Sequence, residues 1–358
     1  MLTISAFGVS ACLLGYLLTL LIGNVLNVKN DVLASYQIKK DPYIYIFLLL
    51  FVAFFGICLF MPDFKDAILP INYRWLLTSF LFAAFIYILY LIEADKLLDF
   101  GVLFFAVLNT FLFADRQVLV DLAPVPWQLS ALGIGLIIGL TTLGARILVG
   151  LTGVFSLVFS LLSFGLFLIA AAGGIPLYLG LMAATMLGVF ACIFQFNRWG
   201  MQLKINEGAM MSACFLFCML LLAGTNELAG PSVFILCFYI LTELLWSLCN
   251  QYILRRKEND LYFNTVYFHA FEKGLELGTV HILILKICVI NIVLAIFELY
   301  AQNAFTLPIL AFVINFWFLS KMYNAGQEQQ SFKEINKNFV ENLKSEIKDI
   351  KQTFNKKD

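Results

Sequence analysis

The sequence predicts an all-α fold, a polytopic integral membrane bundle of about eleven transmembrane helices. Of the 358 residues, 62% are apolar and only 13% are charged, and the mean hydropathy is +0.91. A soluble domain carries about 25% charged residues. The apolar residues also form long unbroken runs, as transmembrane helices require, because every backbone polar group in the hydrocarbon must be satisfied within its own segment.

Eleven apolar runs can be marked along the chain: 3–24, 43–61, 75–92, 101–114, 129–149, 151–171, 176–195, 210–223, 232–254, 282–301 and 304–320. The runs at 101–114 and 210–223 are short for a full crossing. We therefore expect neighbouring polar residues to extend them, or the runs to line a site within the bundle. The first run lacks a basic leading region and a small-residue cleavage site, so we expect a retained helix rather than a signal peptide.

The distribution of Lys and Arg predicts the orientation. Connections after odd-numbered runs hold eleven of these cations, whereas connections after even-numbered runs hold three. The tail after the last run adds eight Lys on the odd side. Because short cytoplasmic loops retain positive charge, we expect an external N-terminus and a cytoplasmic C-terminus, with a transmembrane domain at 1–320 and a cytoplasmic tail at 321–358. We therefore expect a multi-pass membrane protein, and the motif resemblance described below implies the bacterial inner membrane.

The tail is predicted to be an amphipathic helix. Seven apolar residues between Phe332 and Phe354 are spaced three or four apart, which places them on one helical face. Such a helix would lie on the inner leaflet, pair as a short coiled coil in a homo- or hetero-oligomer, or extend into solvent. No nucleic-acid partner is expected.

The eight cysteines lie in or beside apolar runs, where thiols behave as small hydrophobic groups. They predict neither a disulfide framework nor a metal site. Cys214 and Cys218 are one helical turn apart, but no His or carboxylate accompanies them.

Five polar stretches stand out because charges within or beside spans are costly and usually face a cavity or pair with one another. They are the loop 196–208, the connection 255–281, Glu243 in the middle of a run, the stretch 93–96 and the turn 143–150. The loop 196–208 would bind a phosphate or nucleotide, with Glu207 on a hard cation, or be an ordinary solvated loop. Basic residues in the connection 255–281 would bind lipid headgroups or only fix topology. Glu243 would serve a functional site or a structural hydrogen bond.

Two of these stretches carry short motifs in the second half of the chain. The segment 196–207 aligns without a gap to a pattern reading F-N-x-P-P-A-x-I-F-M-G-D, matching at Phe196 and Asn197, with Glu207 in the place of the final acid. In the connection 255–281, His269, Lys273 and Gly274 match a pattern reading H-H-H-x-x-x-K-G.

The remaining stretches match more weakly. Thr242 and Glu243 resemble an acidic element of the ninth span, and Ala94-Asp95-Lys96 resembles D-D-K with its first acid replaced. The turn from Ala145 to Gly150 falls where a V-D-G-x-D-G pattern is expected, with Arg146 and Val149 in the places of the two acids.

Taken in order, these motifs resemble those of the polyprenyl-phosphate N-acetylhexosamine-1-phosphate transferases. Members of that family transfer a sugar-1-phosphate from a UDP-sugar to a membrane polyprenyl phosphate with Mg²⁺ and release UMP. The resemblance implies catalytic roles for Asp95 and His269, nucleotide-binding roles for Asn197 and Lys273, and a metal role for Glu207. Further candidates are Glu93, Arg146 and Glu243. Span order and loop lengths carry the resemblance over residues 1–320, and the eleventh span with its tail is closer to the O-antigen branch.

Three functions stay open from the sequence. The first is a divergent relative with weakened or lost catalysis that keeps the scaffold in cell-envelope glycan biosynthesis and binds polyprenyl phosphate, a related lipid or a UDP-sugar. The second is a working sugar-phosphate transferase with a rearranged site. The third is an unrelated membrane transporter. Arg146 bears on this choice, because a cation there would repel Mg²⁺ or bind phosphate itself.

Overall fold

The computed structural model describes residues 8–21, 73–92, 95–113, 126–149, 153–198, 207–224, 230–252, 264–301 and 306–325. All regular elements in these ranges are helical. The labelled helices are α4 (Tyr73–Leu91), α5 (Asp95–Phe113), α7 (Trp127–Gly144), the short 3₁₀ helix η1 (Ala145–Val149), α8 (Val154–Ala171), α9 (Leu177–Arg198), α10 (Glu207–Gly224), α11 (Gly230–Tyr252), α12 (Val266–Glu272) and α13 (Leu277–Ala301). Two further helices, Gly8–Leu21 and Thr306–Ala325, are named the N-terminal and the C-terminal helix.

Ten of the eleven predicted apolar runs coincide with helices, and the run 43–61 lies outside the described residues. Among the described residues, five helices are long and apolar enough to cross a membrane, and five shorter apolar helices accompany them. The protein is therefore a multi-pass helical membrane bundle. The two short runs are extended by polar residues, as predicted: α5 begins at Asp95 and α10 begins at Glu207. The predicted tail helix also lies outside the described residues.

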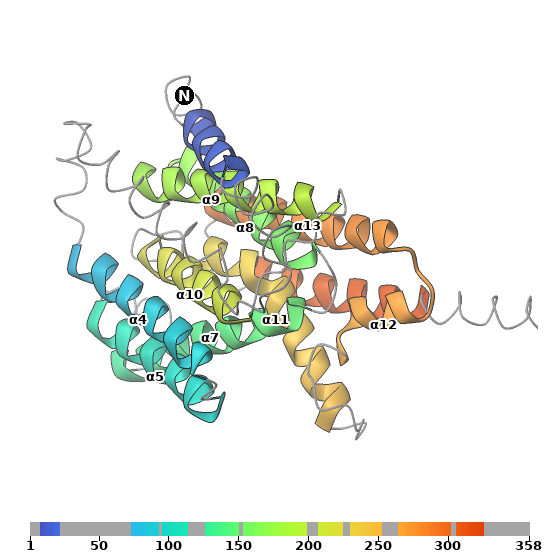
Figure 1. Cartoon of the computed structure of the whole chain (residues 1–358), viewed down its shortest axis with the longest axis horizontal. Coiled ribbons are helices and arrows are strands. Elements are labelled where there is room, and N and C mark those ends of the chain that lie inside the picture. Colours follow the sequence, from blue (N-terminus) through green and yellow to red (C-terminus); the bar gives the residue numbers. More distant parts are fainter. Residues whose placement is uncertain are drawn as a thin grey trace, which may run out of the picture.

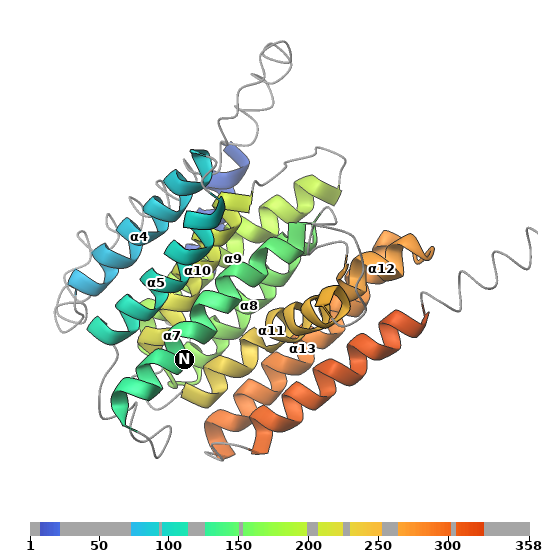
Figure 2. The same ribbon diagram turned by 90° about the horizontal axis from the view of Figure 1, so that it is seen from below.

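The helices form a bundle with two flanks and a buried centre. Figure 2 shows α4 and α5 along one flank, α13 and the C-terminal helix along the other, and α7, α8, α10 and α11 between them. On the second flank, α13 exposes large apolar side chains at three- to four-residue spacing, such as Ile282, Leu285, Val289 and Val293. A helix face of this kind is suited to contact lipid.

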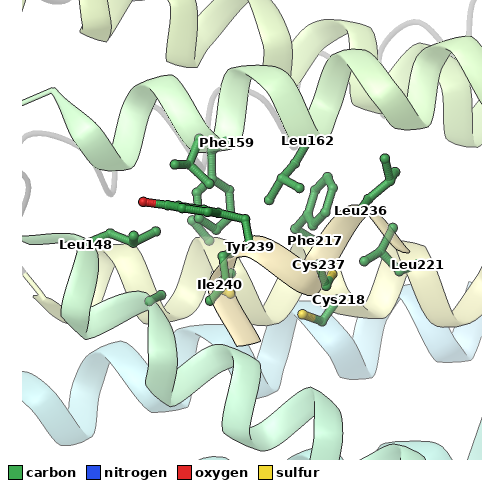
Figure 3. Close-up of a cluster of buried hydrophobic side chains, with 14 of the residues drawn as sticks. Leu148, Phe159, Leu162, Phe217, Cys218, Leu221, Leu236, Cys237, Tyr239 and Ile240 are labelled. Carbon is green, nitrogen blue, oxygen red and sulfur yellow. The ribbon is translucent and has the colours of Figure 1, made fainter. Parts of the chain in front are cut away.

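Aromatic and sulfur-containing side chains fill the centre of the bundle. Figure 3 shows Tyr239 of α11 beside Leu148 of η1 and Phe159 of α8. Cys218 and Cys237 belong to the same cluster, and all described cysteines are free thiols. This is the hydrophobic role that the sequence predicted for them.

Side-chain hydrogen bonds join neighbouring helices, because apolar packing alone does not fix how one helix is positioned along another. Ser212 of α10 donates to the Ala83 carbonyl of α4 at 2.9 Å. On the other flank, Asn291 of α13 and Asn315 of the C-terminal helix exchange two hydrogen bonds, of 3.1 and 2.6 Å. The amide pair fixes the register between these two helices.

The N-terminal helix packs on α9 through close backbone contact, and Figure 1 shows the two helices crossing. A Cβ atom at Gly188 of α9 would overlap the Cys12 carbonyl, and one at Gly15 would overlap the Thr185 carbonyl. Glycine is required at both positions because the obstructing atoms belong to the backbone. Tyr16 also donates a hydrogen bond to Gln195 across this interface.

We predict that Gly188→Ala destabilises the protein, because the added methyl group forces the N-terminal helix away from α9. Overpacking of this kind costs about 1–3 kcal/mol, measurable as a lower thermal unfolding midpoint in detergent. Gly133→Ala is the matched control, since a Cβ there meets nothing within 4 Å. Equal losses in the two variants would contradict close packing at Gly188.

Candidate functional site

The short 3₁₀ helix η1 carries Arg146 and links α7 to α8. The five-residue turn η1 contacts α7, α8, α10 and α11. Its buried side chains Ile147 and Leu148 anchor it in the core. Arg146, which precedes these two residues, is only partly buried. The turn therefore presents one cation from an otherwise apolar segment.

Arg146 forms an ion pair with Asp99 of α5. The Arg146 Nη1 and Asp99 Oδ1 atoms are 2.6 Å apart, with side chains 23% and 50% exposed. An ion pair this exposed contributes at most about 1 kcal/mol to stability. The ion pair matters more for the local charge. At position 146, where the resemblance implies a metal-binding acid, the protein has a guanidinium with a carboxylate partner.

Asp99 is a site residue that the sequence reasoning missed. It lies on α5, four residues after Asp95, a spacing of about one helical turn. This spacing was visible in the sequence and would have identified Asp99 as a companion of Asp95. The structure places Asp95 as the first residue of α5, but its side chain is outside the described part of the chain.

Glu243 lies fully buried in α11 and binds the start of α12. The backbone N–H of Tyr267 donates to Glu243 Oε1 at 3.2 Å. The next N–H group, of Phe268, is capped by the Thr265 side chain at 3.3 Å. The first N–H groups of a helix have no partner within the helix, so Glu243 supplies one that the short α12 needs. Of the two roles predicted for Glu243, the structural hydrogen bond is the one observed.

Tyr267 extends this connection from α12 to η1. Its ring is fully buried, and its hydroxyl donates to the Ile147 carbonyl. Residues 147, 243 and 267 therefore form one continuous contact from η1 through α12 to α11. The sequence reasoning did not select Tyr267, because a tyrosine in an aromatic stretch carries no signal of its partner.

Other polar groups lie buried beside Glu243. Within the described residues, Glu243 Oε2 and the hydroxyls of Tyr239 and Ser247 are buried without a hydrogen-bond partner. Tyr239, Glu243 and Ser247 are four residues apart on α11 and share one helix face. Buried polar groups without partners are uncommon in proteins, and in membrane spans they mark functional positions.

His269 is in the middle of α12, but its ring is largely covered. The side chain is 7% exposed. Its ring stacks on Tyr323 of the C-terminal helix, with centroids 4.6 Å apart and an interplanar angle of 11°. The stacked pair joins α12 to the C-terminal helix.

Lys273 and Gly274 end α12 in a Schellman motif. The Leu275 N–H donates to the Ala270 carbonyl at 3.0 Å, and the Gly274 N–H donates to the Phe271 carbonyl at 2.9 Å. Gly274 has φ of +109°, which L-residues rarely adopt. The match of Gly274 to the K-G pattern therefore has a purely structural explanation. Lys273 is half-buried at the C-cap.

The remaining predicted residues are placed by their backbone alone. Asn197 lies in the last turn of α9 and Glu207 begins α10, while Glu93 is outside the described residues. A Cβ atom at Gly208 would overlap the Tyr90 ring at the end of α4, so the start of α10 lies against the end of α4.

The described side chains do not fit a Mg²⁺ site. No group of three or more His, Cys, Asp or Glu in this part of the chain is arranged to hold a metal ion, and Mg²⁺ prefers several oxygen ligands. Arg146 adds a positive charge beside Asp99, which opposes cation binding there.

Comparisons with known proteins leave the family open. No protein-family model, no curated protein and no solved structure matches this chain.

We predict that Glu243→Leu loosens α12, because it leaves the Tyr267 N–H buried without an acceptor. Such a loss costs about 1–3 kcal/mol and should appear as faster amide hydrogen exchange across Val266–Glu272, measured by mass spectrometry. Glu243→Gln is the control, since its amide oxygen still accepts the hydrogen bond. If exchange in Glu243→Leu matched the wild-type protein, the hydrogen bond would have no role in holding α12.

Proposed function

We propose that this protein is a divergent member of the polyprenyl-phosphate sugar-1-phosphate transferase family that binds polyprenyl phosphate with weakened or lost catalysis. It would serve cell-envelope glycan biosynthesis in the bacterial inner membrane. The proposal includes eleven spans, an external N-terminus and a cytoplasmic tail, as the Lys and Arg distribution predicts.

The observation that carries the proposal is the ion pair between Arg146 and Asp99. An active member needs acids to hold Mg²⁺ between two polyanions. A guanidinium in that place disfavours the metal, but it offers a phosphate monoester two parallel N–H donors. Asp99 balances that charge while no phosphate is bound, and its half-exposed carboxylate can be displaced into water.

The neighbourhood of the motif remnants also supports the proposal. Asp99 follows the stretch 93–96 on α5 and pairs with Arg146 of η1. Tyr267 links η1 to α12, and Glu243 links α12 to α11. Four elements, α5, η1, α12 and α11, are thus joined in one chain of contacts, and this supports the proposal.

We predict no UMP release above background from the purified protein in lipid with polyprenyl phosphate, Mg²⁺ and a panel of UDP-sugars. The reason is that Arg146 and Val149 stand in the places of the two acids of the family pattern. UMP would be measured by chromatography, with an active family member as the positive control. Release that disappears in Glu207→Ala would contradict the proposal and establish the alternative, an active transferase with a rearranged site.

We predict opposite effects on polyprenyl phosphate binding from the two halves of the ion pair. Arg146→Gln should weaken binding by about 10- to 100-fold, the value of a charge-assisted hydrogen bond. Asp99→Asn should strengthen binding, because it removes the competing carboxylate. Affinity would be measured by thermophoresis in detergent, with the uncharged polyprenol as the ligand control.

The opposite signs separate binding from stability, since either substitution breaks the same ion pair. Equal losses of affinity would mean that the pair acts only through the fold. No binding by the wild-type protein would remove the proposed function and favour an unrelated transporter.

A further inference from the structure

A second candidate site lies on the flank of the bundle, between α13 and the C-terminal helix. A groove of about 440 Å³ is lined there by Lys286 and Leu283 of α13 and by Trp317, Lys321 and Asn324 of the C-terminal helix, together with Phe318, Met322 and Ala325. Both lysines are exposed. Figure 2 shows these two helices side by side along the edge of the bundle.

The two lysines lie at the same level of this helical pair. Fifteen residues separate Lys286 from Ala301 at the end of α13, and fifteen separate Thr306 from Lys321. At 1.5 Å rise per residue, each lysine is about 22 Å from the connection between the helices. This distance is less than the roughly 30 Å thickness of the hydrocarbon. Each lysine therefore lies inside the far boundary of the hydrocarbon and extends its side chain toward the headgroups there.

The charge of the groove has no internal balance. Neither lysine has a carboxylate partner within the part of the chain that the structure describes, and no acid is among the groove residues. Lys321 Nζ lies 6.0 Å from the centroid of the Trp317 ring, and that ring is 58% exposed. Tryptophan and lysine together are typical of the level where lipid headgroups meet the hydrocarbon.

The surroundings specify what kind of anion reaches the groove. The C-terminal helix exposes Ile309, Val313 and Phe316 along its length below Lys321. A free phosphate would contact only the polar groups of the groove, whereas a phospholipid would also cover this apolar surface with its acyl chains. We propose that the groove between α13 and the C-terminal helix binds the phosphate of an anionic phospholipid through Lys286 and Lys321, with its acyl chains on the exposed helix face.

The test uses Trp317 as the reporter, because it lines the groove. The full chain would be placed in phosphatidylcholine nanodiscs. One set would contain a fixed fraction of brominated phosphatidylglycerol, and the other set would contain the same fraction of brominated phosphatidylcholine, with the bromine on the acyl chains in both. Subtracting the emission of Trp317→Phe isolates this residue from the other four tryptophans. We expect stronger quenching by the brominated phosphatidylglycerol, with a local enrichment on the order of fivefold for each lysine.

Variants separate headgroup recognition from general contact with lipid. The double variant Lys286→Gln/Lys321→Gln should lose the preference for phosphatidylglycerol while its thermal midpoint stays unchanged, because both side chains are exposed. Trp127→Phe, at the start of α7, should keep the preference. Equal quenching by the two brominated lipids, or a preference that survives the double variant, would overturn the proposal.

Competitors test the other occupants. Relief of quenching by millimolar inorganic phosphate would assign the site to a free anion and overturn the lipid assignment, and relief by equimolar polyprenyl phosphate would assign it to that lipid instead. Shielding of Trp317 from both brominated lipids would indicate the tail 326–358 as the occupant. With the phospholipid as occupant, neither competitor changes the quenching. The result does not depend on UMP release or on Arg146, so the two proposals fail separately.

Discussion

The hydrogen bond from the Tyr267 N–H to Glu243 decides how the chain returns to the bundle after α11. A seven-residue helix has too few internal hydrogen bonds to be stable alone, so α12 depends on what its ends contact. Glu243 and Thr265 satisfy its first N–H groups, and the Schellman motif at Gly274 satisfies its last carbonyls. With both ends fixed, Tyr267 reaches η1 and His269 reaches the C-terminal helix.

This dependence changes the meaning of the motif remnants. Glu243, His269 and Gly274 have packing or capping roles in the structure, so each can be retained without catalysis. Arg146 is different, because its partly exposed ion pair with Asp99 contributes at most about 1 kcal/mol to stability. A phosphate-binding role therefore rests on Arg146 more than on His269, although the resemblance gives His269 the catalytic role.

The sequence predicts the helices well because twenty apolar residues have few alternatives in a membrane. Even the polar starts of α5 and α10 followed from the length that a crossing needs. Contacts between segments far apart in the chain could not be predicted from the sequence. Nothing local to Arg146 identifies Asp99 as its partner, and nothing local to His269 indicates Tyr323. The spacing of Asp95 and Asp99 could have been used, whereas the ring stacking at His269 depends on a helix that begins 37 residues later.

The C-terminal helix separates two kinds of contact by helical position. Asn315, Leu319 and Tyr323 recur every four residues and face the bundle, through the amide pair with Asn291 and the stacking on His269. Trp317, Lys321 and Asn324 recur at four and three residues on a different face and line the groove. Substituting the groove lysines therefore does not disturb the contacts by which the C-terminal helix packs on the bundle. A change in lipid preference without a change in stability is then a property of the groove, because the two faces share no side chain among these six.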